Sequence, residues 1–79
     1  MKLPRDLSGQ RLARTLIAKW QYRQVNRVGS HIILQTEEPQ HHRLSVPDHP
    51  SLRVGTLSAI LRDVARAKDV SRDEIINSL

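Results

Sequence analysis

Hydrophobic residues recur along this chain with two different spacings, which predict helices near both ends and strands between them. From residue 9 to residue 20 the apolar positions lie three or four residues apart, as on one face of a helix. These positions are Leu12, Ala13, Leu16, Ile17 and Trp20. The same spacing returns later and predicts a second helix, whose apolar face is Leu57, Ile60, Leu61, Val64 and Ala65.

Hydroxyl side chains indicate where the helices begin, because a hydroxyl group at a helix start accepts a hydrogen bond from a free backbone N–H group. Ser8 precedes the first helix, and Thr56 is the expected cap of a second helix that Gly55 opens. Ser71 and Glu74 have the spacing of a capping box and predict a short third helix. Its expected apolar contacts are Ile75, Ile76 and Leu79.

The middle of the chain alternates between apolar and polar residues and predicts three strands, over residues 22–28, 31–36 and 42–46. Their short connections favour antiparallel pairing. The expected fold class is therefore α+β, with the order helix, three-stranded antiparallel sheet, helix and short C-terminal helix. Alternation places one set of residues on the face that the helices cover, namely Val25, Ile32, Leu34, Leu44 and Val46. It leaves His31 and Arg43 on the open, solvent-facing side.

The length of 79 residues is expected to make one domain, spanning residues 1–79. The chain has no Cys, which excludes disulfides, thiolate zinc sites, iron–sulfur clusters and a thiol nucleophile. Its apolar runs are too short for a signal peptide or a membrane-spanning helix. We therefore expect a cytoplasmic protein that does not act at a membrane.

Basic residues exceed acidic ones by 13 to 8, which gives a formal net charge of +5. Most of the basic residues are Arg, whose guanidinium group matches the geometry of phosphate. Nucleic acid or an acidic protein is thus the expected class of partner. Trp20 and Tyr22 are the only aromatic residues of the sequence. This argues against proteins that stack successive bases on aromatic platforms.

Four histidines, at positions 31, 41, 42 and 49, are the leading candidates for acid–base chemistry, because the imidazole pKa lies near neutrality. RNA cleavage needs no protein nucleophile, since the ribose 2′-OH can attack the adjacent phosphorus. A general base, a general acid and positive charge near the phosphate are sufficient. The histidine spacing does not match that of a metal site, so we expect neither a metal ion nor another cofactor.

Several candidate positions also have an ordinary structural interpretation. His31 follows Gly29 and Ser30, which let a backbone approach a ligand closely, or simply form a turn that enters a strand. His49 lies in a loop, either near substrate or exposed to solvent. Arg53 precedes a helix start that could hold a phosphate or only need a cap. Further along, we expect Arg62, Arg66 and Lys68 to form an exposed helix face.

Taken together, these segments resemble the HicA toxin family, also known as YcfA-like mRNA interferases. The resemblance runs along nearly the whole chain. It rests on Leu3-Pro4, Ser8-Gly9, Val28-Gly29-Ser30-His31, Val46-Pro47-Asp48-His49, Gly55-Thr56-Leu57, Ile60-Leu61-Arg62-Asp63 and the segment 70–76. No single piece is specific, but their order in so short a chain is. Many relatives have a Gly where this chain has Gln21, which would cost about 1 kcal/mol if that backbone is left-handed.

The resemblance implies a fold like that of double-stranded-RNA-binding domains and a toxin that cleaves mRNA without a metal. It implies a HicB-like antitoxin as partner, and it selects His31 as the catalytic residue. Expected RNA contacts are Gly29, Ser30, Arg43, His49 and Arg53. Two alternatives remain open: a double-stranded-RNA-binding module without catalysis, and a degenerate toxin that acts only as a regulator with its antitoxin.

Overall fold

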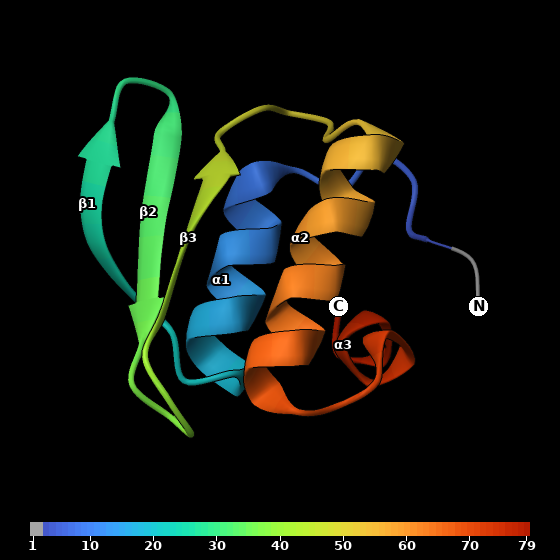
Figure 1. Cartoon of the computed structure of the whole chain (residues 1–79). Helices are drawn as coiled ribbons and strands as arrows, with labels where there is room; N and C mark the ends of the chain where they lie inside the picture. The colour runs from blue at the N-terminus through green and yellow to red at the C-terminus, as the bar shows by residue number, and fades with distance from the viewer. Residues whose placement is uncertain (1–2) are drawn as a thin grey trace.

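The computed structural model describes residues 3–79 and contains three helices and three strands in that range. Along the chain they follow in the order α1 (Gly9–Lys19), β1 (Arg23–Val28), β2 (His31–Thr36), β3 (His42–Pro47), α2 (Val54–Lys68) and α3 (Arg72–Asn77). Figure 1 shows α1 and α2 side by side against one face of the sheet, with α3 beyond α2. The predicted α+β class and element order are confirmed.

The sheet is antiparallel with strand order β1-β2-β3, so β2 is central. Ile32 pairs with Val46 and Leu34 with Leu44, and these four side chains lie on the helix side. Ile32, Leu34 and Val46 are buried, and Leu44 packs against the core. His31 and Arg43 are exposed, as predicted for the open face. The period-two pattern therefore assigned the faces of β2 and β3 correctly.

Strand β1 departs from simple alternation. Its pairing with β2 shifts register between Gln24 and Asn26, so that Val25 lies in a β-bulge. Val25 was expected in the core but is only half-buried. A bulge inserts one unpaired residue, and it breaks the alternation from which a face is predicted.

The core lies between the sheet and the helices. Its fully buried apolar side chains are Leu12, Leu16, Leu34, Val46, Leu57, Leu61, Val64 and Ile75. Ile17, expected on the buried face of α1, is 42% exposed, because the core side of this helix is formed by Leu12, Ala13 and Leu16. Lys68, expected on an exposed face, is buried. Arg62 and Arg66 are exposed as predicted.

The helix starts agree with the sequence at two of three places. The Ser8 hydroxyl accepts from the Arg11 N–H at 3.0 Å, and Ser71 forms a complete capping box with Glu74. The prediction for α2 is wrong, because this helix begins at Val54 and is preceded by Arg53, whose side chain makes no capping hydrogen bond. The Arg53 carbonyl already accepts from the Leu57 N–H, which places Thr56 inside the first turn.

Gln21 follows α1 and has φ of 62°, so the backbone there is left-handed, a conformation that costs a residue other than Gly about 1 kcal/mol. Among residues 3–79, no helix has the length and hydropathy that a membrane span requires.

Candidate active site

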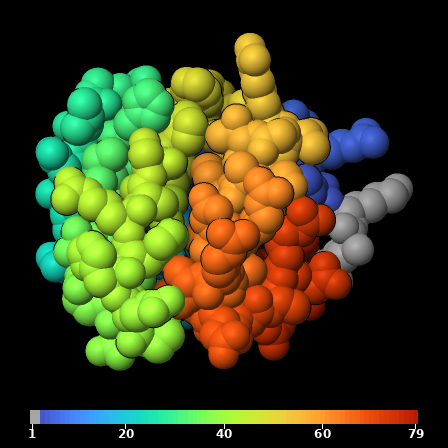
Figure 2. Space-filling model, in the orientation of Figure 1, coloured from blue at the N-terminus to red at the C-terminus, as the bar shows by residue number. Residues whose placement is uncertain are grey.

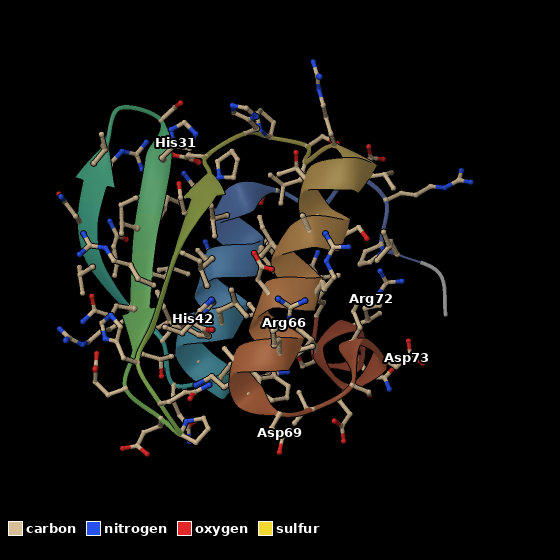
Figure 3. The ribbon with its side chains drawn as sticks, in the orientation of Figure 1. His31, His42, Arg66, Asp69, Arg72 and Asp73 are labelled. Carbon is tan, nitrogen blue, oxygen red and sulfur yellow. The ribbon has the colours of Figure 1, made fainter. Side chains whose placement is uncertain are left out.

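The turn between β1 and β2 carries His31. Gly29 has φ of 58°, a left-handed conformation that Gly adopts without steric cost. His31 then opens β2, between Val28 on one neighbouring strand and Pro47 on the other. Its side chain is exposed on the open face of the sheet, at the end of β2 next to the turn (Figure 3). A strand pairing on both sides thus fixes the backbone beneath an accessible imidazole.

The loop that follows β3 is tied to this turn. The Asp48 N–H donates to the Ser30 carbonyl at 2.7 Å. His31 and His49 each lie one residue from this hydrogen bond, so the fold places the backbones of these two candidate histidines near each other. On the other side of the loop, the Gly9 N–H donates to the His49 carbonyl at 2.9 Å.

Gly9 is the first residue of α1 and packs directly against the end of β3. A Cβ atom on Gly9 would lie 1.8 Å from the Pro47 carbonyl oxygen, far inside van der Waals contact. The close approach of α1 to the His49 loop therefore requires glycine at this position.

Asp48 holds the same region through its side chain. An Arg27 guanidinium nitrogen lies 2.6 Å from an Asp48 carboxylate oxygen. Hydrogen bonds from Arg27 and then from Gln10 lower the pKa of Asp48, against the opposing effect of burial. The ionised carboxylate thereby links β1, α1 and the loop after β3. This pair was missed in the sequence, because only the pairing register reveals that Arg27 reaches residue 48.

The remaining predicted contact residues lie further away. Arg43 shares the open face with His31 but is four residues from Pro47, the partner of His31, or about 13 Å along the strand. Arg53 is exposed at the start of α2, at the other end of the loop that begins with Asp48. The structure therefore gathers Gly29, Ser30, His31 and His49 and leaves the two arginines apart from them.

The arrangement is an accessible imidazole at the end of the central strand, beside a Gly turn, in a chain of net charge +5. Comparison with known families adds the deciding observation. The sequence profile of a family described as the HicA toxin of bacterial toxin–antitoxin systems matches residues 13–65. The chain belongs to the HicA toxin family. No curated protein and no solved structure matches it significantly.

The HicA match covers more than half of the chain and includes the turn, His31, the Asp48 loop and most of α2. It confirms the resemblance seen in the sequence. This HicA protein is thus a toxin of a toxin–antitoxin system, and an antitoxin is its partner. Within residues 3–79 the structure forms no group of three or more His, Asp or Glu side chains arranged to hold a metal ion.

Proposed function

We propose that this toxin is an endoribonuclease that cleaves mRNA, with His31 as its acid–base residue. The observation that carries the proposal is the exposed imidazole of His31 on the open sheet face, beside a Gly turn, in a member of the HicA toxin family. An accessible imidazole can exchange protons with a bound RNA backbone.

The proposed reaction uses the RNA as its own nucleophile. The ribose 2′-OH attacks the adjacent phosphorus, a base takes the hydroxyl proton, and an acid supplies a proton to the departing 5′ oxygen. His31 performs one of these two proton transfers. Gly29, Ser30 and His49 contact the RNA next to it, while Arg43 and Arg53 hold phosphates further along the strand.

The test compares purified wild type with His31→Ala and with Asn77→Ala, an exposed residue of α3 that serves as control. We expect wild type and Asn77→Ala to cleave RNA and to stop growth on induction, and His31→Ala to do neither. Both variants should keep the wild-type circular dichroism spectrum, since each position is exposed. Undiminished cleavage by folded His31→Ala would exclude His31 as the acid–base residue.

A double-stranded-RNA-binding module is the second candidate function, because the element order is the one found in such domains. A module of this kind would bind duplex RNA without cutting it. Wild-type protein that shifts an RNA duplex in a gel but leaves every RNA intact would favour binding alone.

Cleavage is expected to persist in excess EDTA, because a 2′-OH nucleophile with histidine acid–base chemistry needs no metal ion. The assay is repeated with and without EDTA and then with added Mg²⁺ or Zn²⁺. Activity that EDTA removes and a divalent ion restores would contradict the metal-independent mechanism.

We also propose that the antitoxin is HicB-like and that the pair acts in the cytoplasm, where mRNA is found. The net charge of +5 favours an acidic partner, because opposite charges accelerate association.

A further inference from the structure

A second polar site lies away from His31, in a groove between β3 and α2. Its lining residues are Gln40, His41, His42, Asp63, Arg66 and Ala67, and its volume is about 220 Å³. Figure 2 shows the hollow between the yellow-green side chains of β3 and the orange ones of α2. His42 and Arg66 approach it from the two elements (Figure 3). Since His42 pairs with Thr36, the groove is five residues from His31 along β2, or about 17 Å.

The β3 side of the groove is held in place by contacts between His42 and the buried Tyr22. The Tyr22 hydroxyl and His42 Nδ1 are 2.8 Å apart. Burial, and then the charge of Asp63, raise the pKa of Tyr22 to about 12, so the phenol keeps its hydrogen. The hydrogen bond between this buried hydroxyl and Nδ1 fixes the orientation of the His42 ring at the groove. Lys68 lies 4.7 Å from the centroid of the Tyr22 ring and donates to Thr36 Oγ1 at 2.9 Å, and so fixes the phenol in place.

The other wall presents a carboxylate and a guanidinium group from one turn of α2. Asp63 and Arg66 are exposed, and in the part of the chain from residue 3 onward the ion pairs within 4.0 Å are Arg27 with Asp48 and His41 with Glu37. Asp63 therefore keeps two acceptor oxygens for a ligand, and Arg66 keeps a fork of donors.

The chemistry of these groups selects a planar, uncharged ligand with both donors and acceptors. The charges of Asp63 and Arg66 cancel, so the groove does not favour phosphate alone. Its volume is below the roughly 300–1,000 Å³ of pockets for drug-sized ligands. Unpaired RNA bases are recognised by histidine or arginine stacking and by hydrogen bonds to their Watson–Crick edges.

We propose that this groove binds one unpaired base of the RNA substrate, with guanine preferred. Guanine offers N1–H and N2–H₂ on one edge to the two oxygens of Asp63, and O6 and N7 on the adjoining edge to Arg66. The imidazoles of His41 and His42 supply faces for stacking. This inference rests on the proposed function, because an RNA strand that crosses the edge strand β3 would reach both the groove and His31.

The test measures base binding without cleavage. Isotopically labelled full-length His31→Ala protein is titrated separately with the 5′-monophosphates of guanosine, adenosine, cytidine and uridine and with inorganic phosphate, and backbone amide shifts are followed. We expect the guanosine nucleotide to shift residues 40–42 and 63–67 at the lowest concentration. Phosphate should leave these residues unchanged.

Asp63→Asn is expected to weaken binding of the guanosine nucleotide about tenfold, as loss of a bidentate base contact does. Arg62→Gln, the neighbouring exposed residue outside the groove, is the matched control and should bind as before. Equal shifts with all four nucleotides, shifts reproduced by phosphate, or no shift in the groove would overturn the proposal. The titration does not depend on cleavage. Absence of ribonuclease activity would therefore overturn the proposed function, while base binding in the groove would still be tested.

Discussion

The side chain of Lys68 is only 9% exposed, although it carries a charge. Its ammonium group donates to Thr36 Oγ1 and to the Glu38 carbonyl oxygen, and it lies over the Tyr22 ring. Desolvation by burial lowers the pKa of Lys68, against a smaller raising effect of Glu38. The three contacts replace the water that burial removes, and they connect α2 to the loop between β2 and β3.

Substitution of Lys68 by Ala should therefore destabilise the fold by about 1–3 kcal/mol, because it removes hydrogen bonds that a charged donor makes to Thr36 Oγ1 and to the Glu38 carbonyl oxygen. Urea unfolding followed by circular dichroism measures the change. Arg62→Ala, on an exposed turn of the same helix, should stay within about 0.5 kcal/mol of wild type. Equal stability of the two variants would show that the Lys68 contacts add nothing.

Helix α2 contributes the largest block of the core, and Leu61 lies at its centre with no exposed surface. Leu61→Ala should lower the free energy of unfolding by about 2–5 kcal/mol, because it removes buried apolar volume and leaves a cavity. For a chain of this length, such a loss is expected to leave much of the protein unfolded. A change below about 1 kcal/mol, measured by the same urea titration, would contradict the packing described for this helix.

The sequence was most informative where periodicity was regular. In α2 the apolar spacing identified the buried face, and in β2 alternation separated Ile32 and Leu34 from His31. Prediction from the sequence failed where the structure departs locally from regular periodicity or capping. The bulge at Val25 has no signature in residue types, and α2 begins at Val54 without a capping side chain from Arg53, the residue before it.

Contacts between distant segments were beyond prediction for a different reason. The pairing of Arg27 with Asp48 and of Tyr22 with His42 depends on strand register and loop path, which no spacing along the chain encodes. The candidate role of His31 came from its motif, and its exposed position on the open face followed from alternation.

Stability of the whole molecule should fall in two steps as the pH is lowered. Burial lowers the pKa of His42 below 6.5, against the raising effect of the Asp63 charge and with smaller lowering effects of Lys68 and His41. The unfolded chain thus binds more protons than the folded one below about pH 6.5, and folding weakens there. Hydrogen bonds from Arg27 to Asp48 and from His41 to Glu37 lower both carboxyl pKa values, so a second loss follows near pH 4.

Urea midpoints measured from pH 8 to pH 3 check this profile. His42→Gln should remove the step between pH 7 and 5 and retain the one near pH 4. A wild-type protein whose midpoint is constant from pH 8 to pH 5 would show that His42 titrates equally in both states.

The antitoxin is expected to cover the open face of the sheet, since occupation of that face would keep RNA from His31. Hydrogen exchange on the purified complex should then show added protection in residues 29–36 and 42–49, relative to the free toxin. Raised ionic strength should weaken the complex if rim charges contribute. Protection confined to α1 or α3 would mean that inhibition does not work by steric occlusion.

The contact of Gly9 with Pro47 bears on which mutations can inactivate the toxin in a population of cells. Cells that survive toxin expression without antitoxin carry inactivating mutations, and replacement of His31 is the expected kind. Any side chain at Gly9 collides with the Pro47 carbonyl oxygen and displaces the His49 loop, although residue 9 takes no part in the chemistry. Sequencing of survivors should therefore find Gly9 substitutions repeatedly. Mutation of this one codon would then be a frequent cause of toxin inactivation.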